Sequence, residues 1–163
     1  MLKDFTNENF DIFIQAGQSN SEGYGFGTVD EPYEPNELVW YMNGDYTLSW
    51  AAEKVNGNEI QSTYALSFAR EYLNNGLLKD GRKLLILRTS VGGTGFLSNR
   101  WNMTGDLYLN MMEMIRTALA LNRKNCIVGI LWHQGENDAV LNATYEVHYN
   151  NVMGLIHAIR NEF

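Results

Sequence analysis

Short apolar runs alternate with longer amphipathic stretches along this chain. Apolar runs lie at residues 11–17, 83–89 and 126–132, and a shorter candidate lies at 38–42. Apolar runs of this length without polar alternation are typical of strands that are covered on both faces. The pattern therefore predicts a sheet built from four strands.

Apolar residues recur at helical spacing in three segments, at 62–75, 106–122 and 144–162. This spacing is typical of helices that pack one face against a core. Because such helices alternate with apolar strands, we expect an α/β domain whose parallel sheet carries helices on both faces. For the last helix we expect an inner face made of Tyr145, Tyr149, Val152, Ile156 and Ile159.

The composition fits a single globular domain over residues 1–163, with 45% hydrophobic and 19% charged residues. The formal net charge is −7 and Lys and Arg form no cluster, which argues against a nucleic acid or an anionic membrane as partner. The single cysteine, Cys126, excludes an internal disulfide and is expected to be a small, buried core residue. The N-terminal residues hold no long apolar segment, so we expect neither a signal peptide nor a membrane span, and a cytoplasmic location.

Three of the predicted strands end in segments that could carry chemistry. The sequence GQSN occupies 17–20, SVGGTG occupies 90–95 and HQGEND occupies 133–138. In parallel sheets the functional loops gather at the carboxyl ends of the strands. We therefore expect these three segments to meet at one rim of the sheet.

Ser19 and the glycine turn suggest the parts of a nucleophilic site. Ser19 follows a buried strand directly and is a candidate nucleophile, although a serine hydroxyl reacts poorly until a neighbouring base takes its proton. The alternative is a serine that caps a helix or lies in a loop. The Gly92-Gly93 turn offers backbone N–H groups that could hold a developing oxyanion. Its alternative is a tight turn between strand and helix.

The third segment is polar although the strand before it is apolar. Burying such side chains without partners is costly, so we expect them to face a cleft. A metal site made of His133, Glu136 and Asp138 is disfavoured, because no second histidine or cysteine lies at a suitable spacing. A nucleotide-binding domain is disfavoured too, because the sequence has neither G-x-x-x-x-G-K-[ST] nor a strand-linked G-x-G-x-x-G. We therefore expect no metal and no cofactor.

Taken together, QAGQSN, SVGGTGF and LWHQGENDA resemble the motif blocks of the SGNH-hydrolase superfamily. The resemblance is strongest to its sialate O-acetylesterase and acetyl xylan esterase branch, carbohydrate esterase family 6. It implies a three-layer α/β/α sandwich with a short parallel sheet, a flavodoxin-like arrangement. It also implies a serine esterase that removes O-acetyl groups from a carbohydrate, or from another small ester, through an acyl-enzyme.

The same resemblance assigns roles to residues of the three motifs. It makes Ser19 the nucleophile and builds the oxyanion hole from the Ser19 N–H, an N–H of the Gly92-Gly93 turn and the side-chain amide of Gln134. Glu136 would orient the site, and we count Gly93, Gln134 and Glu136 with Ser19 as catalytic. Residues of the same motifs are expected to contact the substrate, namely Gln18, Asn20, Gly92, Thr94 and His133.

One part of the family pattern is missing from the sequence. The family's general base is a histidine in a D-x-x-H block after a fifth strand, and no such block follows HQGEND. Without that strand, the strand at 126–132 would have an open edge, which favours association. We expect a complementing polypeptide, pairing of two copies, or a truncated and poorly active chain. His133 as a substitute base is an alternative. A second hypothesis is a non-catalytic or incomplete hydrolase subunit that binds acetylated sugar.

Overall fold

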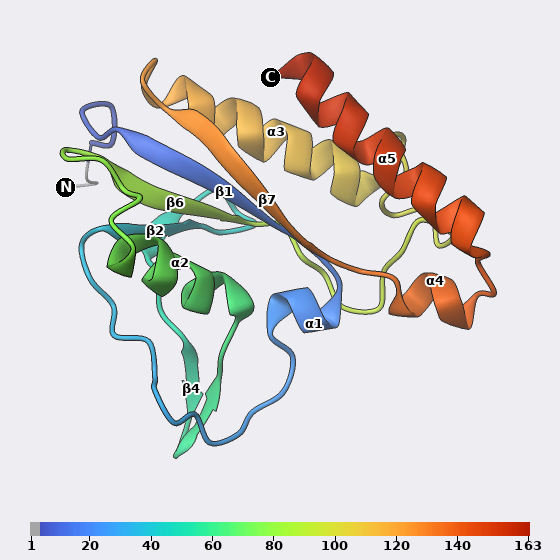
Figure 1. Cartoon of the computed structure of the whole chain (residues 1–163), viewed down its shortest axis with the longest axis horizontal. Helices are drawn as coiled ribbons and strands as arrows, with labels where there is room; N and C mark the ends of the chain where they lie inside the picture. Colours follow the sequence, from blue (N-terminus) through green and yellow to red (C-terminus); the bar gives the residue numbers. More distant parts are fainter. Residues whose placement is uncertain (1–3) are drawn as a thin grey trace.

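The computed structural model describes residues 4–163, so the first three residues of the expected domain lie outside the described part. A five-stranded sheet forms its centre, in the order β3-β2-β6-β1-β7 (Figure 1). Its strands are β1 (Phe10–Gly17), β2 (Val39–Met42), β3 (Leu48–Trp50), β6 (Lys83–Arg88) and β7 (Cys126–His133). β3 runs antiparallel to β2, and the other neighbouring strands are parallel. The four predicted strands are therefore confirmed, in a mainly parallel sheet.

Helices cover both faces of the sheet, which confirms the α/β/α layers. Figure 1 shows α3 (Asp106–Ala120) and α5 (Tyr145–Glu162) on one side, and α2 (Tyr64–Asn74) on the other. The period-two alternation of a strand divides its side chains between these layers. In β6, Leu85 and Leu87 pack into the core under α3 and α5, whereas Leu84 and Ile86 pack into the core under α2.

Five short elements were not predicted. They are β3, the hairpin of β4 (Lys54–Asn56) and β5 (Glu59–Gln61), and two short helices, α1 (Ser19–Glu22) and α4 (Glu136–Val140). Each has three to five residues, which is too short for a hydrophobic period to be read. The two short helices follow β1 and β7 directly and therefore shape the rim of the sheet.

β7 is an edge strand, because among the described strands it pairs with β1 alone. This position corrects the expectation for Cys126, whose side chain is exposed rather than buried. Val128 is 40% exposed for the same reason. A groove of about 670 Å³ runs beside the free edge and is lined mainly by apolar residues of β7, α3 and α5, among them Leu119, Ile127, Val128, Ile130, Ile156 and Phe163.

The expected inner face of α5 is also corrected in part. Leu155 and Ile159 are buried, but Tyr145 and Tyr149 are 83% and 49% exposed. The first turns of α5 lie beside α4, beyond the end of the sheet (Figure 1), so these two rings stack on each other at 5.9 Å instead of packing on strands. No helix in the described part of the chain combines the length and the apolar character that crossing a membrane requires.

Candidate active site

The three motif segments meet at the carboxyl ends of β1, β6 and β7. The Gln18 N–H donates to the carbonyl oxygen of His133 at 3.1 Å, and the Val91 N–H donates to that of Gly17 at 3.2 Å. Gly17 permits this close approach, since a Cβ there would lie 2.0 Å from the His133 carbonyl oxygen, and its φ is +137°. The chain thus turns sharply from β1 into α1, with Ser19 as the first helical residue.

Ser19 lies next to the glycine turn that follows β6. A Cβ built on Gly92 would be 3.6 Å from Ser19 Cβ. Ser19 itself is half-buried. Within residues 4–163, its hydroxyl makes no hydrogen bond to a histidine. The two histidines near the motifs lie beside carboxylates instead. His133 Nε2 is 3.7 Å from Glu136 Oε1, and His148 Nδ1 is 3.3 Å from Asp138 Oδ2. Ser19 and the glycine turn therefore lie together, and no histidine pairs with the Ser19 hydroxyl among the described residues.

Glu22 contacts the same turn, a contact that sequence reasoning missed. Its carboxylate accepts the Gly92 N–H at 3.0 Å. It lies three residues after Ser19 on the single turn of α1, a helix too short to be predicted from the sequence. The sequence therefore carries no signal for this contact. The Gly92 N–H is thereby occupied, whereas the N–H groups of Ser19 and Gly93 are among those of the two turns that donate no hydrogen bond within the described residues.

Ser21 connects the three strand ends through hydrogen bonds of its buried side chain. It is fully buried. Its hydroxyl contacts the Ala16 carbonyl oxygen at 3.0 Å, the Ser90 hydroxyl at 2.7 Å and the Tyr64 hydroxyl at 3.1 Å. The Tyr64 hydroxyl in turn donates to the carbonyl oxygen of Leu131 at 2.5 Å. One small side chain therefore connects the ends of β1 and β6 with α2 and, through Tyr64, with β7.

Gln134 is buried and is already hydrogen-bonded inside the protein. Its amide nitrogen lies 3.0 Å from Asp138 Oδ2, 3.2 Å from the Thr94 carbonyl oxygen and 3.4 Å from Gln18 Oε1. Gln18 is buried as well, and its Oε1 also accepts the Asn137 N–H at 3.0 Å. In this structure both residues join the three motifs, and their expected contacts with an oxyanion or a substrate stay predictions.

Asp138 fixes the loop after the glycine turn. It is 1% exposed. Its Oδ2 accepts the Phe96 N–H at 3.1 Å and its Oδ1 accepts the Leu97 N–H at 2.8 Å. The Thr94 hydroxyl, also buried, donates to the Val91 carbonyl oxygen at 2.6 Å and accepts the indole N–H of Trp101 at 3.0 Å. Thr94 thus shapes the loop from inside, and its expected contact with substrate stays a prediction.

The outer rim is formed by the remaining predicted site residues. The Asn20 side chain donates to Glu136 Oε1, which links α1 to α4, and His133 is exposed beside them. Gly92 and Gly93 are exposed too. No group of three or more His, Cys, Asp or Glu side chains suited to a metal ion occurs in the part of the chain that the structure describes.

Two hollows open beside α1, and sequence reasoning did not anticipate them. One of about 260 Å³ is lined by residues that include Asn43, Thr89, Ser90 and Asn110. The other, of about 250 Å³, includes Tyr41, Trp50 and Lys54. Glu22 and Arg88 line both. The only sequence signal for Arg88 was a charge at the end of a buried apolar strand.

Comparisons with known proteins agree with this architecture. A family model described as carbohydrate esterase, sialic acid-specific acetylesterase, matches residues 9–163. The crystal structure of a protein from Arabidopsis thaliana is similar with a TM-score of 0.76 and 24% identity, covering 95% of this chain and 69% of that one. The crystal structure of NanS is similar with a TM-score of 0.75 and 20% identity, covering 95% of this chain and 62% of NanS. No curated protein matched the chain.

Proposed function

The chain belongs to the carbohydrate esterase family of sialic acid-specific acetylesterases, and from this we propose that it takes part in removing O-acetyl groups from a carbohydrate through an acyl-enzyme on Ser19. The observation that carries the proposal is the position of Ser19 at the start of α1, against the Gly92-Gly93 turn. The substrate would be an acetylated sugar.

The proposed reaction has two steps. Ser19 Oγ attacks the acetyl carbonyl carbon while a base takes the hydroxyl proton, and the carbonyl oxygen becomes an oxyanion. The oxyanion would be held by the Ser19 and Gly93 N–H groups, each typically contributing a few kcal/mol. The sugar oxygen then leaves with a proton from the base, and water hydrolyses the acetyl-serine to acetate.

A segment outside residues 4–163 would supply the base. In the described part of the chain the Ser19 hydroxyl has no histidine partner. The free edge of β7 and the groove beside it offer a place where a further strand could add to the sheet. Because His133 ends β7 at the rim that holds Ser19, a strand parallel to β7 would also deliver its following loop to that rim.

A serine-reactive phosphonate probe with intact-mass detection tests the proposal. We expect one label on the parent chain, found on Ser19 by peptide mapping, and no label on Ser19→Ala. Ser67→Ala, which removes an exposed serine of α2, serves as the matched control and should label like the parent. Equal labelling of the Ser19→Ala chain and the parent would exclude Ser19 as the nucleophile. Adding a peptide that carries the D-x-x-H segment should accelerate labelling.

A second candidate is a non-catalytic subunit that binds acetylated sugar. The observation that favours it is the same unpaired hydroxyl of Ser19 among the described residues. Turnover of p-nitrophenyl acetate separates the two candidates. Turnover that depends on Ser19 in the chain alone would contradict the binding subunit, and sugar binding without any turnover, with or without the complementing peptide, would favour it.

A further inference from the structure

Glu22 carries a half-buried carboxylate on the same helical turn as Ser19. The two residues are three positions apart, a spacing that places their side chains on one face of a helix. Gly92 lies between them, since a Cβ built on it would be 3.6 Å from Ser19 Cβ and 3.6 Å from Glu22 Oε2. The carboxylate therefore borders the space in which an ester at Ser19 would lie.

The charge of Glu22 is not neutralised within the described residues. There its carboxylate accepts one hydrogen bond, from the Gly92 N–H at 3.0 Å, and forms no ion pair. Arg88 lines the same two hollows, but its guanidinium stacks 4.8 Å from the centre of the Tyr41 ring and donates to Asn43 Oδ1 at 3.4 Å. A carboxylate has about four acceptor positions, so most of those of Glu22 are left for donors from outside.

Sugar hydroxyl groups are donors of the required kind. A hydroxyl that donates to a carboxylate forms a charge-assisted hydrogen bond, which is roughly twice as strong as a neutral one. Glu22 lines both hollows beside α1, of about 250 and 260 Å³, so there is open space beside its carboxylate for a sugar ring. Acetylation of a hydroxyl removes the donor and brings a carbonyl oxygen, which only accepts hydrogen bonds, against the negative charge.

We propose that Glu22 is a substrate-binding residue that selects partly acetylated sugars, because its carboxylate accepts free hydroxyl groups of the sugar whose acetyl ester lies at Ser19. This inference rests on the proposed function for the position of the ester. It adds a substrate class, namely sugars that still carry free hydroxyls beside the ester. Fully acetylated sugars are then poor ligands.

Calorimetric titration of the whole chain with two forms of the methyl glycoside of N-acetylneuraminate tests the inference. One form is acetylated at its primary hydroxyl alone and the other at every hydroxyl, so the two share a carboxylate and differ in their free hydroxyls. We expect the first form to bind about tenfold more tightly, since its charge-assisted hydrogen bonds are lost in the second.

Two substitutions of Glu22 should change this ratio of affinities. Glu22→Gln should lower it to about threefold or less, because a neutral amide oxygen still accepts the Gly92 N–H but binds hydroxyls less strongly. Glu22→Ala, which has no acceptor, should remove the preference. A purely structural role of Glu22 in the glycine turn would weaken binding of both forms alike and leave the ratio unchanged.

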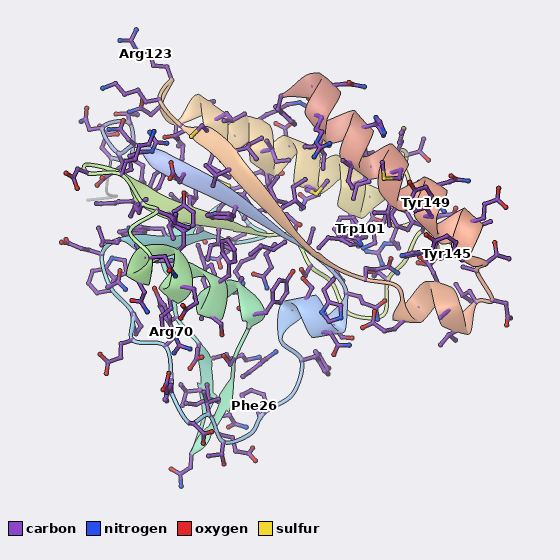
Figure 2. The ribbon with its side chains drawn as sticks, in the orientation of Figure 1. Phe26, Arg70, Trp101, Arg123, Tyr145 and Tyr149 are labelled. Atoms are coloured by element: carbon purple, nitrogen blue, oxygen red, sulfur yellow. The ribbon has the colours of Figure 1, made fainter. Side chains whose placement is uncertain are left out.

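Glu37→Gln is the matched control. It removes the same charge from the exposed turn before β2. Because β2 is parallel to β6, this turn lies away from the rim, at the end of the sheet where Figure 2 shows Arg123. The control should keep the ratio of the parent.

Three results would each overturn the inference, namely equal affinity of the parent for the two forms, an unchanged ratio in both Glu22 variants, or no binding of the first form by the parent. The titration does not depend on turnover, so Ser19→Ala should show the ratio of the parent. Failure of the labelling experiment would therefore remove Ser19 as the nucleophile, whereas an unchanged ratio would remove the role of Glu22, and the two failures are distinguishable.

Discussion

Ser21 shows how one buried hydroxyl can hold a rim together. Three oxygen atoms from separate segments lie within 3.1 Å of it, and it is fully buried. Replacing it by alanine leaves the buried Ala16 carbonyl oxygen and the half-buried Ser90 hydroxyl with one partner fewer. Unsatisfied buried groups of this kind cost about 1 to 3 kcal/mol.

We therefore expect Ser21→Ala to lower the free energy of unfolding by about 1 to 3 kcal/mol, measured by urea denaturation followed by circular dichroism. Ser67→Ala, on the exposed face of α2, is the matched control and should change the unfolding free energy by no more than about 0.5 kcal/mol. A Ser21→Ala chain as stable as the control would show that the hydroxyl network contributes nothing to the fold.

The sequence pointed to some site residues and not to others. Ser19 could be proposed because it follows an apolar strand directly, and Gly92 because glycines at a strand end expose backbone donors. Glu22 and Arg88 could not, since their importance comes from contacts across the rim, to Gly92 and to Tyr41. A pattern along the chain does not show which side chains contact each other across the rim.

At the scale of elements, the long strands and helices were predictable and the short ones were not. β1, β6 and β7 have six to eight residues and α3 has fifteen, long enough for a run or a period to be recognised. The burial of Cys126 was wrongly predicted, because an apolar run does not distinguish a central strand from an edge strand. The open edge itself was expected from the missing fifth strand, and the pairing of β7 with β1 alone, among the described strands, agrees with it.

Within β2, Tyr41 gives the sheet a pH dependence. Burial raises the pKa of its hydroxyl from 10.0 to about 12, so the folded chain holds this proton more tightly than the unfolded chain does. The stabilising effect is present below about pH 10 and is lost as the pH rises through about 12, which amounts to about 2 to 3 kcal/mol. The hydroxyl makes no hydrogen bond of normal length among the described residues, although Thr63 lies near enough to lower the pKa of Tyr41 against the larger effect of burial.

Tyr41→Phe is expected to unfold like the parent at about pH 8 and to lose about 2 to 3 kcal/mol less stability between about pH 9 and pH 12. Urea titrations at several pH values measure the difference. Tyr24→Phe, at a ring that is 75% exposed, is the control and should follow the parent. The prediction fails if the parent and Tyr41→Phe lose the same stability on the alkaline side.

At the scale of the whole molecule, the two edges of the sheet differ. β3 closes one edge as a short antiparallel strand. β7 leaves eight residues of parallel strand at the other edge, with no further described strand to pair with. Natural sheets protect such edges with charged side chains, bulges or a covering segment. β7 carries one such bulge at Val128, the residue left over where Ile12 pairs with Ile127 and Phe13 with Gly129, and the rest of its outer edge has no partner among the described strands.

Because this edge is free, we expect the chain to self-associate with rising concentration unless a complementing segment covers it. Val128→Lys places a charge on the edge at a residue that is already 40% exposed, and it should shift the chain toward the monomer in sedimentation velocity while leaving its thermal unfolding unchanged. Val55→Lys, on the exposed β4 hairpin strand, adds the same charge elsewhere and should sediment like the parent.

Association that persists in Val128→Lys, or that falls equally in both variants, would mean that the contact between copies does not run through β7. In that case the open edge would be left for a different polypeptide, and the D-x-x-H peptide should bind the parent and fail to bind Val128→Lys.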